Sequence, residues 1–161
     1  MKLRAMPNAP KPTPVIATAF DVDVFARTIF GEARGETMQG QIAVANVILN
    51  RVRIAQAYFT KNGKSHPLYG SGTIGSACKA RLQFSCWNQG DPTYRAVVAA
   101  NLDDARLQRA TCAALMVLHG QAADNTSGST HYHTPAVSPP WSRGKTPLCT
   151  IGGHLFFNDI D

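Results

Sequence analysis

The stretch "GETMQGQIAVANVILNRVRIAQ", residues 35–56, carries the strongest periodic signal in the chain. Its apolar residues recur three and four positions apart, the spacing that places side chains on one side of an α-helix. The pattern predicts a long amphipathic helix with a wide apolar face, which other elements must cover. The stripe and its neighbours are Ile42, Val44, Ala45, Ile48, Leu49 and Val52.

A second helix is predicted immediately upstream. In "DVDVFARTIFGEARGE", residues 21–36, the apolar positions again follow helical spacing, and Asp21 or Asp23 is expected to cap the N-terminus. Gly31 weakens the continuation of the helix. Glu32 is therefore expected at a helix end.

Downstream the pattern changes. Residues 60–80 are rich in Gly, Ser and Lys without helical or strand periodicity, which predicts a long surface loop. Asp91 as cap and Pro92 as first residue predict a helix to about Ala100. A further helix is predicted over residues 103–119, with Gly120 as its stop. Its inward residues are expected to be Leu107, Ala110, Ala114, Leu115 and Leu118.

The C-terminal part is rich in Pro, Gly, Thr and aromatic residues, which is typical of extended segments joined by turns. The chain is therefore predicted to be α+β but predominantly α-helical, with a short extended C-terminal portion. Residues 1–15 form a predicted flexible, Pro-rich arm. Residues 16–161 form one predicted domain, of ordinary size.

Composition narrows the class of protein. A net charge of +6 and a pI near 9.4 favour polyanionic surroundings such as nucleic acid, anionic lipid or wall polymer. No nucleic-acid-binding motif is recognisable, and no window approaches the ~20 apolar residues of a membrane span. Four prolines interrupt the basic N-terminus, which argues against a secretory signal. The four cysteines lack zinc-finger spacing and are expected to be mostly reduced thiols.

The chain contains only two glutamates, Glu32 and Glu36, and both lie in "TIFGEARGET", residues 28–37. Glycoside cleavage needs a carboxylic acid that keeps its proton near neutral pH, which an apolar niche favours. Ile29 and Phe30 suggest such a niche for Glu32, whereas a helix N-terminus beside Glu36 favours a charged carboxylate. The alternative is that both are ordinary helix-end glutamates.

Four ordered blocks closely resemble the spore-cortex-lytic cell wall hydrolases. They are "ARTIFGEARGETMQGQIAVANVILNRV" (residues 26–52), "FSCWN" (84–88), "THYHTPAVSPPW" (130–141) and "IGGHLFF" (151–157). The resemblance extends over roughly residues 21–158. It implies a lysozyme-like fold related to lytic transglycosylases, which cut the β-1,4 bond between N-acetylmuramic acid and N-acetylglucosamine in peptidoglycan.

The resemblance also implies roles for individual residues. The first glutamate of "GEARGE", Glu32, corresponds to the catalytic acid of the family. A transglycosylase needs one carboxyl group, which protonates the leaving oxygen and then accepts the proton of the muramic acid C6 hydroxyl. The expected substrate-binding residues are Glu36, Ser85, Trp87, Tyr132 and His133.

Several alternatives remain open at this stage. Glu36 could serve as the second carboxylate of a hydrolytic muramidase or glucosaminidase. His131, His133 and His154 could form the zinc site of an amidase, although metal is the less favoured interpretation. A non-catalytic wall-binding module is the third alternative. No cofactor is expected. The expected setting is a monomer made in the cytoplasm that acts on the cell wall, as a phage lysin does.

Overall fold

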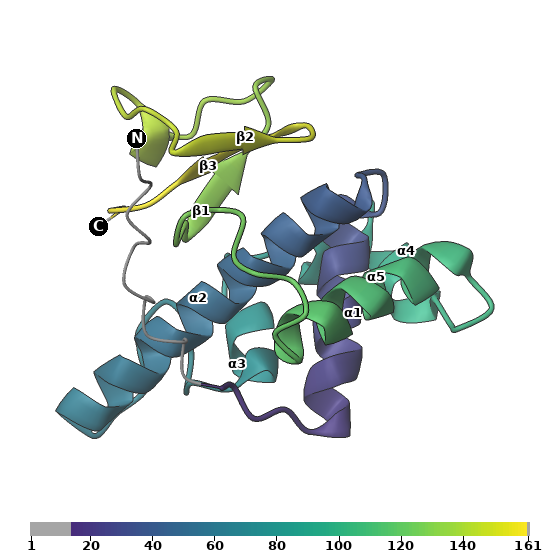
Figure 1. The fold of residues 1–161 in the computed structure, drawn as a ribbon, viewed down its shortest axis with the longest axis horizontal. Helices are drawn as coiled ribbons and strands as arrows, with labels where there is room; N and C mark the ends of the chain where they lie inside the picture. The colour runs from purple at the N-terminus through teal and green to yellow at the C-terminus, as the bar shows by residue number, and fades with distance from the viewer. Residues whose placement is uncertain (1–13, 161) are drawn as a thin grey trace, which may run out of the picture.

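A computed structural model gives the structure of residues 14–160. The elements follow one another in a run of helices and then a small sheet (Figure 1). The helices are α1 (Ala19–Ala33), α2 (Met38–Asn62), α3 (Ile74–Cys78), α4 (Tyr94–Ala99) and α5 (Ala105–Leu118). Two 3₁₀ turns, η1 (Ser85–Trp87) and η2 (Pro140–Ser142), and the strands β1 (His131–His133), β2 (Cys149–Ile151) and β3 (His154–Phe157) complete them.

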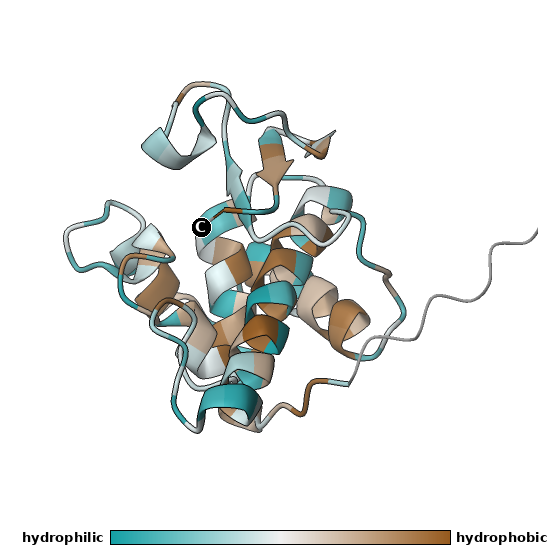
Figure 2. Ribbon diagram, turned by 90° about the vertical axis from the view of Figure 1, so that its left-hand side faces the viewer, coloured by the Kyte–Doolittle hydropathy of each residue, from teal (hydrophilic) through white to brown (hydrophobic). Residues whose placement is uncertain are grey.

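The helices form one layer around a shared apolar core. α1 packs against α5, α3 and α2, and α5 also contacts α2. Figure 2 shows the apolar helical segments gathered inside this layer, while the connecting loops are mostly polar. The predicted apolar face of α2 is confirmed, because its residues are buried against Phe25, Ile29 and Phe30 of α1.

The sheet lies over α2 in Figure 1 and is antiparallel, in the order β1-β3-β2. Tyr132 pairs with Phe156, and His133 pairs with Leu155. Because paired residues share a face and neighbours alternate, Tyr132 and His133 point to opposite sides. Phe156 packs on Ala43 of α2 in a small second core. The sheet therefore presents one face, which includes Tyr132, to the helical layer.

The N-terminus of α1 differs from the prediction. Thr18 is the N-cap, and Asp21 is the third helical residue of a capping box in which the two side chains bond to each other's backbone N–H. Burial opposes ionisation of Asp21, but hydrogen bonds from Thr18 and Gly75 outweigh it and lower its pKa. The prediction of Asp21 or Asp23 as cap is wrong, because Asp21 lies inside the helix and ties it to α3.

Other boundaries also moved. The predicted loop over residues 60–80 contains the end of α2 and the short helix α3. α4 begins at Tyr94, because the Asp91 carboxylate accepts the Thr93 N–H in a turn that precedes the helix. α5 confirms the predicted helix. It ends before Gly120, whose φ of 69° is positive. Leu115 was expected inside but is 38% exposed.

The predicted arm lies mostly outside the described residues. At its end, Val15 already packs against the helical core. Between residues 14 and 160, no helix has both the length and the hydropathy to cross a bilayer. The four cysteines are free thiols in the structure. Complete burial raises the pKa of Cys78 to about 12.

Candidate active site

Glu32 lies in the last turn of α1 and is partly buried. Its Oε1 accepts a hydrogen bond from the backbone N–H of Cys86 at 3.3 Å, and its Oε2 accepts one from the Tyr132 hydroxyl at 3.0 Å. The carboxyl group thus lies where α1, η1 and the sheet meet. The preceding Ile29 and Phe30 are buried as expected, but the contacts of the carboxylate itself are polar.

Tyr132 reaches Glu32 from the middle of β1. Burial and the neighbouring Glu32 raise the pKa of the Tyr132 phenol well above its usual value. The hydroxyl therefore stays protonated at physiological pH and acts as a donor to the carboxylate. This contact joins two segments that the sequence separates by 100 residues.

Arg51 places a buried positive charge behind the site. It interrupts the apolar face of α2, is 4% exposed, and donates from Nε to the Thr130 carbonyl at 2.7 Å. Its guanidinium lies over the Phe84 ring, 4.8 Å from the centroid. Burial lowers the pKa of Arg51 from its very high usual value, while Tyr132 and Glu32 oppose the change. Arginine stays charged in proteins, so this cation supports the Glu32 carboxylate electrostatically.

Glu36 is held by the turn between β2 and β3. Its Oε2 accepts the backbone N–H of Gly153 at 3.1 Å, and its Oε1 lies 3.6 Å from Nδ1 of His154. Side chains cannot be added around it, because a Cβ at Gly40 or Gly153 would lie under 3.0 Å from Glu36 and one at Gly152 would overlap its Oε2. Glycine at positions 152 and 153 therefore lets the turn approach the carboxylate, and Gly40 of α2 leaves room for the Glu36 side chain.

His154 lies between Glu36 and Tyr132. Burial lowers its pKa, and the nearby Glu36 and Glu32 oppose the shift. The ring is therefore predominantly neutral at neutral pH. It contacts the Tyr132 ring edge-on, with the centroids 5.0 Å apart. The two glutamates of the chain are thus joined through a continuous series of contacts, Glu36 to His154 to Tyr132 to Glu32.

The η1 turn approaches α1 closely enough to touch Glu32. A Cβ at Gly31 would lie 2.6 Å from Cβ of Cys86 and 2.8 Å from Cγ2 of Val97. α1 continues through Gly31 to Ala33, so the expected weakening of the helix at this glycine does not end it. The role of Gly31 is to let η1 pack against the helix beside Glu32.

Ser85 and Trp87, the two expected binding residues of η1, have hydrogen-bond partners other than Glu32. Ser85 is exposed, and hydrogen bonds from the Thr93 backbone and the Ser85 side chain lower the pKa of the Asp91 carboxyl. Trp87 donates its indole N–H to the Thr28 hydroxyl at 2.9 Å, one turn before Glu32. Both residues flank the Cys86 N–H that contacts Glu32.

The three histidines do not form one cluster. The ring centroids of His131 and His133 lie 4.9 and 5.5 Å from that of Trp141, on the face of the sheet opposite to Tyr132 and His154. His133 also stacks on Phe157. No group of three or more potential metal ligands occurs among residues 14–160. His133, expected to orient substrate beside Tyr132, is therefore separated from Glu32 by the sheet.

Comparison with known proteins identifies the family of this arrangement. Residues 35–157 match the family described as Cell Wall Hydrolase. The chain belongs to this family. The region of this chain that matches the family includes Glu36, Cys86 and Tyr132. It begins three residues after Glu32.

Relatives and solved structures agree with this assignment. The chain is 30% identical over 86% of its length to a spore cortex-lytic enzyme of Halalkalibacterium halodurans and 26% identical over 84% to that of Bacillus subtilis. It spans only 34% and 37% of these two relatives. The fold is that of the catalytic domain of Bacillus cereus SleB, with a TM-score of 0.64 and 23% identity, over 94% of this chain and 100% of that one. The catalytic domain of the germination-specific lytic transglycosylase SleB of Bacillus anthracis gives a TM-score of 0.62 and 24% identity, over 93% and 100%.

Sequence reasoning missed three parts of the site. The Cys86 N–H is a backbone group and leaves no signature in the sequence. Arg51 was not predicted to take part in the site, although a charged residue within an apolar helical stripe is itself a signal of a buried charge. Gly152 and Gly153 stand in a block that resembles the family, but the partner they approach, Glu36, could not be read from that block.

Proposed function

We propose that this cell wall hydrolase is a lytic transglycosylase that cleaves the β-1,4 bond between N-acetylmuramic acid and N-acetylglucosamine, with Glu32 as its catalytic residue. The observation that carries the proposal is the setting of Glu32, whose two oxygens accept hydrogen bonds from Tyr132 and the Cys86 N–H. Each carboxylate oxygen keeps a second lone pair that can meet a substrate.

The reaction then needs one carboxyl group in two states. Protonated Glu32 donates its proton to the glycosidic oxygen as the bond to the muramic acid C1 breaks. The resulting carboxylate, supported by Tyr132 and the Arg51 charge, removes the proton of the C6 hydroxyl, whose oxygen bonds to C1. The products are a 1,6-anhydro sugar and a free 4-hydroxyl group, and no water is consumed.

Glu36 has a positioning role in this proposal. Its Oε2 accepts the Gly153 N–H, and its Oε1 lies 3.6 Å from His154 Nδ1, beyond hydrogen-bond distance. His154 packs on Tyr132. The contact between Glu36 and the turn therefore helps to keep the sheet in the position from which the Tyr132 hydroxyl reaches Glu32. We therefore place Glu36 in the support of the site and not in contact with the sugar.

The second candidate is a hydrolytic muramidase or glucosaminidase on the same site. It would need another carboxylate to activate water or to attack the sugar. Glu36 is the carboxylate closest in sequence, and its Oε2 accepts the Gly153 N–H of the β2-β3 turn. The transglycosylase is the first candidate because its mechanism needs Glu32 alone.

The products of digestion distinguish the two reactions. We expect the wild-type protein to release muropeptides with anhydro ends from purified sacculi, and mass spectrometry detects them because anhydro and reducing ends differ by one water. Fragments with reducing ends only would replace the transglycosylase by the hydrolase. Intact sacculi after prolonged incubation would refute both.

Tyr132→Phe is expected to lower the rate of sacculus lysis by about tenfold to a hundredfold. The substitution keeps the packed ring and removes one hydrogen bond to a charged group, an interaction of about 1.5–3 kcal/mol. Turbidity of a sacculus suspension measures the rate. Tyr58→Phe, in the C-terminal half of α2, is the matched control and should leave the rate unchanged. A wild-type rate for Tyr132→Phe would remove the phenol from the mechanism.

A further inference from the structure

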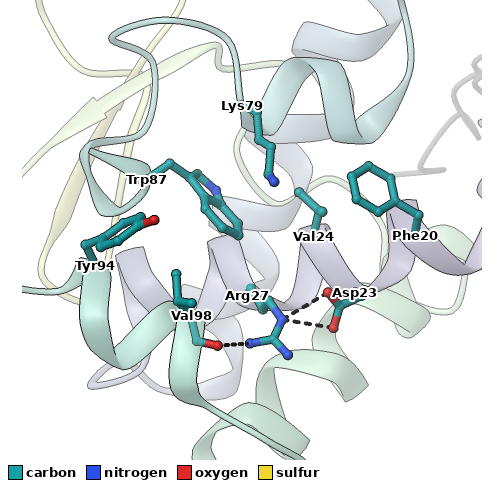
Figure 3. A pocket seen from close by; sticks show the side chains of 8 residues that line it. All are labelled: Phe20, Asp23, Val24, Arg27, Lys79, Trp87, Tyr94 and Val98. Atoms are coloured by element: carbon teal, nitrogen blue, oxygen red, sulfur yellow. Dashed lines mark hydrogen bonds and ion pairs between the residues drawn. The ribbon is translucent and has the colours of Figure 1, made fainter. Parts of the chain in front are cut away.

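A pocket outside the Glu32 site opens on the flank of α1 (Figure 3). Its volume of about 590 Å³ lies within the ~300–1,000 Å³ common for small-ligand sites. The wall is built by α1, the segment after α3, η1 and α4. Three aromatic and three charged side chains line it, namely Phe20, Trp87 and Tyr94, and Asp23, Arg27 and Lys79.

Trp87 is the fixed element of this pocket. Its indole N–H is bonded to the Thr28 hydroxyl, which in turn donates to the Val24 carbonyl at 2.7 Å. The ring orientation is therefore set before any ligand arrives. Binding a ligand on it loses little side-chain conformational entropy. Figure 3 shows the ring between Tyr94 and Lys79, whose Nζ lies 4.7 Å from the ring centroid.

The charged groups around the ring suit a neutral, hydroxylated ligand. Arg27 is already engaged, since its Nε bonds Asp23 at 2.9 Å and its Nη1 bonds the carbonyls of Val97 and Ala100. The Asp23 side chain remains 56% exposed and can accept further bonds. Lys79 is exposed, and its Nζ lies over the rings of Trp87 and Phe20, 4.7 and 5.6 Å from their centroids, where a ligand that stacks on Trp87 would meet its donors. An aromatic face between an acceptor and a donor matches a sugar ring, whose C–H face is apolar and whose edge carries hydroxyl or acetamido groups.

The pocket is also close to the reacting carboxyl group. Arg27 and Glu32 stand on the same helix, about 7.5 Å apart along its axis at 1.5 Å per residue. Trp87 directly follows Cys86, whose N–H contacts Glu32. Five residues also turn the helix by about 140°, so a glycan that occupies both sites must pass around η1.

We infer that this pocket is a second saccharide-binding subsite, in which an N-acetylated sugar of the wall glycan stacks on Trp87 between Asp23 and Lys79. The inference rests on the proposed function for the identity of the sugar. The subsite binds substrate and takes no part in bond cleavage.

Titration with the N-acetylglucosamine tetramer, followed by NMR on the full chain, tests the subsite. Glu32→Gln serves as the background so that no cleavage occurs. We expect the Trp87 indole N–H signal to move on binding and that of Trp141, on the far face of the sheet, to stay in place. Lys79→Ala and Trp87→Ala should each weaken binding about tenfold, the scale of a lost aromatic or polar contact. Lys64→Ala, an exposed lysine outside the pocket, should not.

Kinetics on sacculi provides the second readout. With Glu32 intact, Lys79→Ala should raise KM severalfold and leave kcat unchanged, and it remains informative if Trp87→Ala fails to fold. An unmoved Trp87 signal, or an affinity that the pocket variants do not change, would overturn the subsite. A shifted Trp87 signal together with a wild-type protein that cannot lyse sacculi would overturn the proposed function and leave the subsite in place.

Discussion

Glu32→Gln is expected to leave the protein folded and to lower the rate of sacculus lysis by at least about a hundredfold. A general acid–base group typically contributes about 10²–10⁴-fold to the rate. The amide has the shape of the carboxyl group and can still accept a hydrogen bond from Tyr132 or Cys86. It cannot donate a proton to the leaving oxygen or accept one from the C6 hydroxyl. Turbidity and the yield of anhydro muropeptides measure the loss.

Asp103→Asn is the matched control, because it makes the same carboxyl-to-amide change at an exposed position before α5. It should lyse sacculi at the wild-type rate. Circular dichroism and thermal unfolding should be the same for both variants and the wild type. Lysis by Glu32→Gln at the wild-type rate would refute the proposed mechanism.

Gly152→Ala is expected to lower the lytic rate by about tenfold to a hundredfold, since a misplacement of about 1 Å in a site can cost a hundredfold. The added methyl group would overlap Oε2 of Glu36, so the carboxylate and the β2-β3 turn must move apart. His154 and Tyr132 would move with the turn, and the bond from Tyr132 to Glu32 would lengthen. Sacculus turbidity and thermal unfolding measure the two consequences.

Gly144→Ala separates this contact from simple backbone strain. Both glycines have positive φ, 55° at Gly152 and 74° at Gly144, but a Cβ at Gly144 meets nothing within 4 Å. Each substitution should therefore cost about 1–2 kcal/mol of stability for the left-handed backbone, and only Gly152→Ala should lose activity. In a Glu36→Ala background the additional loss from Gly152→Ala should disappear. An equal loss in both single variants would refute the positioning role of Glu36.

The helical layer was largely predictable because its information is local. The apolar stripe of α2, the stop of α5 at Gly120 and the extended C-terminal portion each follow from residues close together in the chain. Boundaries failed where a side chain found a different partner from the one assumed. Asp21 bonds back to the Thr18 N–H instead of capping, and Asp91 bonds the Thr93 N–H and delays α4.

The candidate site was predictable only in part. The block "GEARGE" drew attention to Glu32, and "THYHTPAVSPPW" drew attention to Tyr132, before any contact between them was known. His133 was grouped with Tyr132 on sequence proximity. Strand alternation places these neighbours on opposite faces, and only the pairing with β3 shows which face meets the helices.

The amino-acid sequence by itself determined where the long helices α1, α2 and α5 lie, which apolar residues of α2 face the core, and that both glutamates stand together around the end of α1. These features depend on the spacing of apolar groups and on residue types within a few positions. Only the tertiary structure decided what each glutamate touches, because the Tyr132 hydroxyl lies 100 residues from Glu32 and the Gly153 N–H lies 117 residues from Glu36. The two carboxylates are close in sequence, yet Tyr132 reaches one from β1 and Gly153 reaches the other from the β2-β3 turn, because the sheet packs on α2.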